Sequence, residues 1–541
     1  MDIKKRRDSA GLHPEALFAY DDVDTAVLAD ALLRIGEYVA DHGLEGEGPY
    51  QAARDLVLRH VPRVGSQPLR ADGETSLGAA LRLATALDGG VLPIQGPPGS
   101  GKTYTGGRMI TAMAKAGPRV GVTANSHKVI RNLLDEVCRA ADEFAVDLTC
   151  IQKVPETDTD APRLRFTTDN AACLSALQGD CRVAGGTAWF WARPDAFQAV
   201  DVLFVDEAAQ MSLANVLAVS QAANTVVLLG DPQQLDQATQ GSHPDGTDTS
   251  ALGHVLAGHQ TIPEDRGLFL EETWRLHPTI CAFSSELFYE GRLHPRPGLE
   301  LQEIRSTGPI HGSGLRYRPV VHTGNQSSSP EEAEVVRTLV RGVLDSNPTW
   351  IDREGLELPL TLADILIIAP YNAQVFELQT GLAGARIGTV DKFQGQEAPL
   401  VIYSMTTSSF ADAPRGMEFL YSLNRLNVAT SRAKCVCVLV ASPMVLEADC
   451  CTPEQMRLAN AYCRYVELAR IAALRSTTSF RGGALLMRDP IRSTTSRPRS
   501  ALFTMRVSAS LASATSGGLL SKNRSAAAAF VRAAAMGCLI S

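Results

Sequence analysis

The sequence has no long apolar run. Nowhere in its 541 residues do about 18 apolar residues follow one another without interruption, which is the length that a membrane-spanning helix needs. The first residues, MDIKKRRDSAG, are basic, but no apolar segment follows them as it would in a secretory signal. These absences argue against a membrane or secreted protein, and we expect a cytoplasmic location and no membrane partner.

Paired cysteines are also missing. The eleven cysteines include no CxxC spacing, so neither a zinc site nor an iron–sulfur site can be read from them. Free thiols buried in a reducing compartment are the simpler interpretation.

Positive charge is scarce over most of the chain. The net charge is -8, but residues 471–541 hold ten Lys or Arg and one acid, Asp489, which leaves 41 basic and 58 acidic residues in 1–470. A body with a net charge of -17 repels phosphate as a whole. A nucleic-acid partner would therefore need a local basic groove on this acidic body.

Short apolar runs alternate with amphipathic stretches from about residue 76 onward. The runs are VLPIQ, RVGVT, VDVLFVDE and TVVLLGD, and after residue 265 they are ILIIAPY, RIGTVD, LVIYSM and CVCVLVAS. This alternation predicts an α/β fold of parallel strands joined by helices, in two domains over 76–262 and 263–470. Ahead of them, residues 1–75 are expected to form a helical connecting region, with helices near 24–40 and 50–59.

The last segment, 471–541, has a different composition. Ala, Ser and Arg dominate it, RSTTS occurs twice, and no hydrophobic period is sustained. We interpret it as a low-complexity basic tail that is disordered or transiently helical. An altered reading frame in GC-rich coding DNA would give a similar composition rich in Arg, Ala and Ser, and the sequence leaves this alternative open.

A glycine-rich loop, IQGPPGSGKT, follows the run VLPIQ. Backbone N–H groups over 97–103 would surround phosphates, Lys102 would reach the β- and γ-oxygens, and Thr103 would ligate Mg²⁺. We therefore predict ATP and Mg²⁺ as cofactors. The residues predicted to cradle the phosphates are Gly96, Pro97, Pro98, Gly99, Ser100, Gly101, Lys102 and Thr103.

Two acids end the run VLFVDE. Asp206 would hold Mg²⁺ through water, and Glu207 would polarise an attacking water. Enzymes that transfer phosphate to a substrate need no water-activating base at this position. The pair therefore favours hydrolysis over transfer.

Six motifs, in order, resemble those of superfamily 1 helicases. They are DEAAQ (206–210), GDPQQL (230–235), TWRLHPTICAFSSELFYEGRL (273–293), IIAPYNAQ (367–374), TVDKFQGQE (389–397) and RLNVATSRAK (425–434). The resemblance covers about 76–470 and is closest to superfamily 1B, the branch that contains the nonsense-mediated-decay RNA helicase. The motif sequences also resemble the helicase half of bacterial fusion proteins whose other half is a RecB-like nuclease.

The resemblance implies two tandem RecA-like P-loop domains, with ATP in the cleft between them and a single strand across their tops. Gln234 would sense the γ-phosphate, and Trp274, where the family usually has Tyr, would stack on adenine. Arg275 and Arg432 would reach across from the second domain as arginine fingers, and Glu397 would contact the ribose.

Neutral side chains are the implied contacts of the single strand. For Ser126, a helix N-cap is an equally good interpretation. The residues concerned are Thr123, Asn125, Ser126, Thr187, Pro370, Tyr371 and Thr389.

Two features of the family are lacking. The stretch 76–90 has no glutamine to read adenine, and Gln67 lies in a proline-rich segment, so nucleotides other than ATP stay open. Residues 1–75 lack the Asp…Glu-x-Lys arrangement of a metal nuclease, so we predict no DNA cleavage and allow for a separate nuclease subunit.

The function that follows is an ATP-dependent translocase or helicase that moves 5′ to 3′ on single-stranded DNA, in bacterial DNA repair or processing. An RNA-remodelling helicase of the same fold and a catalytically degenerate nucleotide-dependent clamp are the alternatives.

Overall fold

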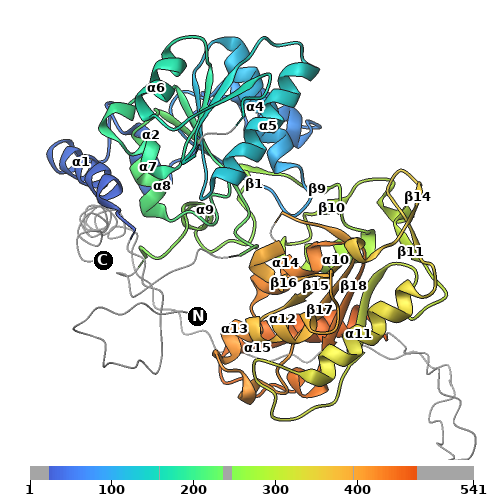
Figure 1. Cartoon of the computed structure of the whole chain (residues 1–541). Helices are drawn as coiled ribbons and strands as arrows, with labels where there is room; N and C mark the ends of the chain where they lie inside the picture. Colours follow the sequence, from blue (N-terminus) through green and yellow to red (C-terminus); the bar gives the residue numbers. More distant parts are fainter. Residues whose placement is uncertain (1–22, 157–158, 236–245, 394, 472–541) are drawn as a thin grey trace, which may run out of the picture.

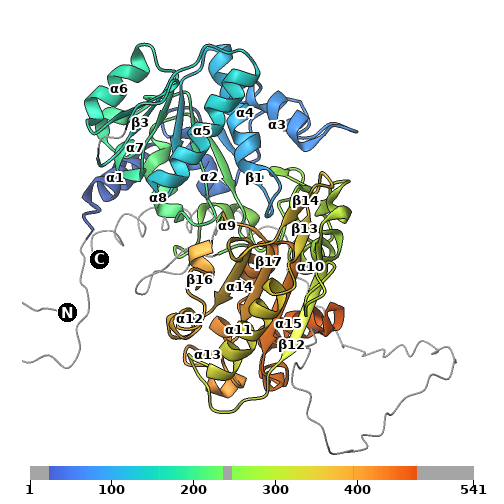
Figure 2. The same cartoon turned by 45° about the vertical axis from the view of Figure 1, so that its right-hand side comes forward.

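The computed structural model of this protein describes residues 23–156, 159–235, 246–393 and 395–471, which form two lobes (Figures 1 and 2). All but the first residue of the predicted tail lies outside the described residues. Each lobe is built on a parallel sheet with helices packed on its faces. No helix of the described segments is both long enough and apolar enough to cross a membrane.

The first lobe contains a sheet of eight strands in the order β4-β3-β5-β2-β6-β7-β1-β8. Every residue of its central strands β1, β2, β6 and β7 is buried. Parallel strands covered on both faces read as continuous apolar runs, which is why the sequence pattern found them. The strands are β1 (Gly90–Gln95), β2 (Val120–Thr123), β3 (Cys150–Lys153), β4 (Leu164–Thr167), β5 (Val183–Gly185), β6 (Val202–Val205), β7 (Thr225–Gly230) and β8 (Leu268–Phe269).

The helices of the first lobe include both that were expected ahead of the glycine-rich loop. These two, α1 and α2, share one buried apolar cluster with α8, so the region predicted as a separate connector packs onto the first lobe. The helices are α1 (Ala26–His42), α2 (Gln51–Leu58), α3 (Ser76–Ala84), α4 (Lys102–Ala116), α5 (His127–Glu143), α6 (Asn170–Gln178), α7 (Ala188–Trp191), α8 (Leu213–Ser220) and α9 (Ala251–Leu256).

The first lobe also extends further than the predicted boundary at residue 262. Strand β8 pairs in parallel with the end of β1, because the apolar pair Leu268 and Phe269 completes the edge of the first sheet. The chain crosses to the second lobe only after this strand.

The second lobe contains a parallel sheet of six strands in the order β16-β15-β17-β18-β12-β19. Its strands are β12 (Gly314–Pro319), β15 (Ile365–Ala369), β16 (Arg386–Thr389), β17 (Ala398–Ser404), β18 (Ala433–Ala441) and β19 (Arg470–Ile471). Its helices are α10 (Pro278–Phe288), α11 (Pro330–Leu344), α12 (Asn372–Gln379), α13 (Gly416–Leu420), α14 (Leu423–Ser431) and α15 (Pro453–Leu468).

Two small sheets accompany the second lobe. One is antiparallel, with strands β11 (Glu303–Arg305), β13 (Thr349–Ile351) and β14 (Glu357–Pro359), and the other pairs β9 (Glu272–Thr273) with β10 (His294–Pro295). Strand β9 belongs to the segment that joins the lobes, so this segment is held in place at its second-lobe end.

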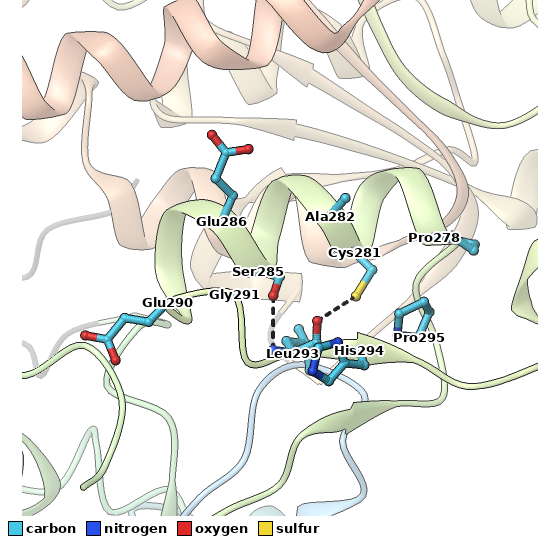
Figure 3. A pocket seen from close by; sticks show the side chains of 10 residues that line it. All are labelled: Pro278, Cys281, Ala282, Ser285, Glu286, Glu290, Gly291, Leu293, His294 and Pro295. Atoms are coloured by element: carbon cyan, nitrogen blue, oxygen red, sulfur yellow. Dashed lines mark hydrogen bonds between the residues drawn. The ribbon is translucent and has the colours of Figure 1, made fainter.

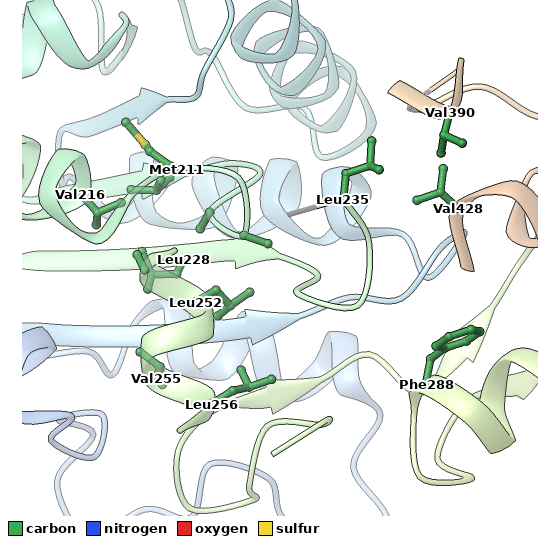
Figure 4. Packing of buried hydrophobic residues seen from close by; sticks show 14 of the residues in the cluster. Met211, Val216, Leu228, Leu235, Leu252, Val255, Leu256, Phe288, Val390 and Val428 are labelled. Carbon is green, nitrogen blue, oxygen red and sulfur yellow. The ribbon is translucent and has the colours of Figure 1, made fainter. Parts of the chain in front are cut away.

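The lobes also meet through apolar side chains. One continuous cluster of buried residues runs through both of them, and Leu235 of the first lobe lies opposite Val390 and Val428 of the second (Figure 4). The contact between the lobes is therefore partly apolar, beside the polar groups described next.

Candidate nucleotide site and strand-binding edge

The glycine-rich loop connects β1 to α4. Gly101 has φ +80° and leads directly into the helix, whose first residue is Lys102. A side chain at Gly96 would collide with the side chain of Lys102, and Lys102 Nζ donates to the carbonyl of Gly96 at 2.9 Å. The loop thus presents a helix N-terminus and one lysine, which is the arrangement that binds phosphate.

Asp206 and Glu207 follow β6, which is separated from β1 by β7. Asp206 is buried, and its Oδ1 accepts from the Glu207 backbone N–H at 2.9 Å. Burial raises the pKa of Asp206 to about 7, the charge of Glu207 adds to this, and the charge of Lys102 opposes it. Glu207 adopts a left-handed backbone with φ +52°, a strained conformation of the kind that gathers at functional sites.

Gln234 and Arg432 meet across the cleft. Gln234 Oε1 accepts from Arg432 at 3.1 Å, and Gln234 Nε2 donates to Asp231 at 2.9 Å. Arg432 directly follows the last turn of α14 in the second lobe and is 2% exposed. The structure therefore brings together the two residues that were expected to approach the γ-phosphate from opposite lobes.

Arg275 also lies at the loop, but by a different route from the one expected. The segment that carries it is hydrogen-bonded to the loop, with Trp274 N–H donating to the Gly99 carbonyl at 2.8 Å and Thr273 Oγ1 donating to the Pro98 carbonyl at 3.0 Å. Arg275 thus lies on the segment that joins the lobes, and it also donates to Glu397 and to the Ser431 carbonyl of the second lobe. Its role as an arginine finger stays a prediction.

Glu397 pairs with two cations in the cleft. Its carboxylate accepts from Arg275 Nε at 2.5 Å and lies 2.8 Å from Lys434 Nζ. Burial alone would raise the pKa of Glu397, but the charges of Arg275 and Lys434 hold this pKa at about 2. The predicted ribose contact would have to form beside this ion pair.

A cavity of about 730 Å³ adjoins the loop on the side of Trp274. One face of the Trp274 ring is covered by the Arg296 guanidinium, 3.8 Å from the ring centre. Ser76, the first residue of α3, lines this cavity, while Gln67 lines a neighbouring one and accepts a hydrogen bond from Arg82. Trp274, which was predicted to stack on adenine, therefore lines this cavity, and Gln67 does not. The stacking role stays a prediction.

The polar atoms of the cleft fit a triphosphate. Ser100 Oγ and Arg432 Nε are both buried without a hydrogen-bond partner, and phosphate oxygens would supply acceptors to each. Among the described residues no cluster of three or more His, Cys, Asp or Glu could hold a metal by itself. Mg²⁺ bound by Thr103, Asp206 and substrate phosphates is compatible with that, because Mg²⁺ keeps waters and takes few protein ligands.

The residues predicted to contact the single strand divide by exposure. Asn125 and Ser126 are exposed, Thr187 and Thr389 are half-buried, and Thr123, Pro370 and Tyr371 are buried. Thr123 and Thr187 lie at the carboxyl ends of the neighbouring strands β2 and β5. Thr123 is 0% exposed, so the strand contact predicted for it is not accessible in this arrangement.

Ser126 has a structural role in addition. Its Oγ accepts from the Val129 N–H at 3.3 Å and caps α5, which confirms the N-cap interpretation. Asn125 is held next to it, with Nδ2 donating to the Gln210 carbonyl at 2.7 Å. This bond ties the start of α5 to the DEAAQ segment that follows β6.

A separate cavity of about 510 Å³ lies along α10 (Figure 3). It is lined by Cys281, Ser285, Glu286, His294 and neighbouring residues, and it contains none of the predicted site residues. Of the predicted nucleotide residues, Gly99, Ser100, Gly101 and Trp274 line the cavity of about 730 Å³ instead.

Three buried polar residues of the cleft were not singled out from the sequence. Asp231, Tyr289 and Asn427 all lie within motifs quoted above, but they are separated by more than 50 residues along the chain. Each is at most 1% exposed. Their place within the quoted motifs was the available signal, and their partners could not be paired from sequence alone.

The fold and the cleft define a two-lobed P-loop NTPase. Two family profiles, each described as an AAA domain, match residues 78–251 and 248–444. Together they span both lobes, from the glycine-rich loop to the strand that follows Arg432.

Among curated proteins the chain is similar to helicases. It is 27% identical over 354 residues to the Arabidopsis thaliana "Probable helicase MAGATAMA 3", covering 61% of this chain and 40% of that protein. It is 26% identical to "DNA polymerase alpha-associated DNA helicase A" of Schizosaccharomyces pombe, covering 44% and 36%, and 27% identical to "RNA helicase Mov10l1" of Mus musculus, covering 66% and 33%.

The chain therefore contains two segments that match AAA-domain profiles, and it is similar to helicases. It spans two fifths or less of the length of these relatives. The finer resemblance to nuclease–helicase fusion proteins stays a prediction.

Proposed function

We propose that this chain is an ATP-dependent translocase or helicase whose hydrolysis is stimulated by a single strand, with movement 5′ to 3′ on DNA. The observation that carries the proposal is the contact of Arg432, from the second lobe, with Gln234, from the first. A cation delivered across a cleft makes hydrolysis depend on closure of the lobes. Surfaces on both lobes would then move relative to each other in each cycle.

The residues of the cleft have distinct roles in this proposal. Lys102 and the loop N–H groups bind the phosphates, and Thr103 and Asp206 hold Mg²⁺. Glu207 accepts a proton from the attacking water, while Gln234, Arg275 and Arg432 stabilise the charge on the transferred group. ATP supplies the phosphoanhydride bond that is broken. The intact set argues against a degenerate remnant.

The strand is proposed to cross the carboxyl ends of β2 and β5 in the first lobe and of β15 and β16 in the second. Carboxyl ends of parallel strands form the edge at which open α/β sheets bind ligands. An RNA-remodelling activity is the second candidate, since the names of the relatives include both a DNA and an RNA helicase.

ATP hydrolysis measured with and without single-stranded DNA or RNA of the same sequence tests the proposal. We expect DNA to raise the rate about tenfold or more, since closure is then coupled to the strand. Equal rates with and without a strand would identify a different P-loop ATPase, and stimulation by RNA alone would favour the second candidate. Strand displacement from duplexes with 5′ or 3′ overhangs gives the direction.

Two variants show whether the rate comes from this cleft. Lys102→Ala should abolish turnover, and Glu207→Gln should abolish turnover while nucleotide still binds, because the loop and the metal ligands are intact. Turnover near wild type in Glu207→Gln would remove Glu207 from its role.

A further inference from the structure

A chain of buried hydrogen bonds connects the second lobe to the proposed γ-phosphate sensor. Tyr289, at the end of α10, donates through its hydroxyl to Asp231 Oδ2 at 2.7 Å. Asn427, in α14, donates through Nδ2 to the Tyr289 oxygen at 2.8 Å and to the Gln233 carbonyl at 2.7 Å. Tyr289 and Asn427 are both 0% exposed.

The direction of each hydrogen bond in this chain is fixed by its chemistry. A carboxylate accepts and an amide NH₂ donates, so the Tyr289 hydroxyl must donate to Asp231 and accept from Asn427. Asp231 Oδ2 also accepts a hydrogen bond from Gln234 Nε2 at 2.9 Å. The orientation of the Gln234 amide is therefore set by a carboxylate that Tyr289 helps to hold in place, together with the Gln233 N–H at 3.2 Å.

The chain crosses between the lobes. Asp231, Gln233 and Gln234 follow β7 in the first lobe, whereas Tyr289 and Asn427 come from helices that pack on the second sheet. Opening of the cleft would pull the Tyr289 hydroxyl away from Asp231 and remove one of the donors that hold the carboxylate to which Gln234 is bonded. Closing would restore the orientation in which Gln234 Oε1 meets Arg432.

We propose that Tyr289 is a positioning residue that reports the position of the second lobe to Gln234, with Asn427 as its support. The proposal rests on the function proposed above. Tyr289 touches neither nucleotide nor strand in it, so its loss should change the rate of hydrolysis and the response to a strand more than the affinity for ATP.

The variant Tyr289→Phe removes only the hydroxyl. We expect strand-stimulated kcat to fall about tenfold, with KM for ATP within about twofold of wild type, because small misplacement of a catalytic group is costly. Tyr465→Phe is the matched control, since this tyrosine is also fully buried and its hydroxyl donates to the Cys437 carbonyl at 2.8 Å inside the second lobe. Equal kcat values for Tyr289→Phe and Tyr465→Phe would overturn the proposal.

Hydrogen exchange of the ligand-free protein tests the role of Tyr289 without a measurement of enzymatic activity. Tyr289→Phe should speed exchange of the backbone amides at 231–235, and Tyr465→Phe should not; unchanged exchange in both would overturn the proposal. If wild type hydrolyses ATP without strand stimulation, the proposed function fails while this comparison still applies. Should Tyr289→Phe not fold, Asn427→Ala is expected to give the same kinetic split, and wild-type kinetics in it would count against the chain of contacts.

Discussion

At the scale of single residues, the catalytic cleft contains charges that burial makes unfavourable. Asp206 is the strongest case, because burial and the neighbouring Glu207 charge raise its pKa to about 7, well above the ordinary aspartate value of 3.8. Such a carboxyl binds its proton more tightly in the folded chain than in the unfolded chain. An ionised Asp206 is thus a cost to the stability of the ligand-free protein.

The sign of the resulting pH dependence follows. Between about pH 4 and pH 7 the folded state binds more protons at Asp206, so the free energy of unfolding falls as the pH rises. In metal-free buffer Asp206→Asn should therefore unfold at a higher temperature than wild type at pH 8. The gain in the free energy of unfolding could reach about 4 kcal/mol, because the pKa rises from 3.8 to about 7 and each pKa unit corresponds to about 1.4 kcal/mol. This gain should vanish near pH 4.

Thermal unfolding from pH 4 to 8 checks this expectation. The exposed Asp195→Asn is the matched control, and it should follow wild type at every pH. Parallel curves for Asp206→Asn and wild type would show that the buried Asp206 charge does not destabilise the fold.

At the scale of elements, the start of α5 combines a cap with a proposed strand contact. Ser126 caps the helix, so Ser126→Ala should lower the free energy of unfolding by about 1 kcal/mol. Ser126→Asp keeps an oxygen at the cap and suits the helix dipole, yet it adds negative charge where phosphates would pass. We expect its stability to stay near wild type and its affinity for single-stranded DNA to fall several-fold.

The control for this experiment is the cap of α15. Thr452 accepts from the Gln455 N–H at 3.2 Å and caps a helix of the second lobe that contains none of the predicted strand contacts. Thr452→Asp should leave binding unchanged in a fluorescence anisotropy titration at fixed salt. Equal affinities of the Ser126→Asp and Thr452→Asp variants would reduce Ser126 to a helix cap.

The elements also show how far the sequence could lead. Strands buried on both faces, such as β1 and β6, leave unbroken apolar runs, and the motif residues follow directly at their ends, so both could be predicted. Burial of Pro370 and Tyr371 could not, because it depends on what packs against the end of β15, where Phe419 lies 5.4 Å from the Tyr371 ring. The contact of Asp231 with Tyr289 likewise needs two lobes in place, and no local pattern encodes it.

At the scale of the whole molecule, closure of the cleft depends on apolar as well as polar contacts. Leu235 directly follows Gln234 and lies opposite Val390 and Val428 (Figure 4). It is 8% exposed, so its side chain is buried by the other lobe as well as by its own. This apolar contact would favour the closed arrangement of the lobes before any nucleotide binds.

Leu235→Ala should therefore loosen the lobes without unfolding either of them. The radius of gyration of the ligand-free protein, measured by small-angle scattering, should rise, and strand-stimulated hydrolysis should slow because Arg432 meets Gln234 less often. Leu256→Ala is the matched control, since Leu256 is buried in the first lobe at the end of α9. It should cost about 2–5 kcal/mol of stability with no change in radius. A Leu235→Ala protein as compact as wild type would mean that the polar contacts alone hold the two lobes together.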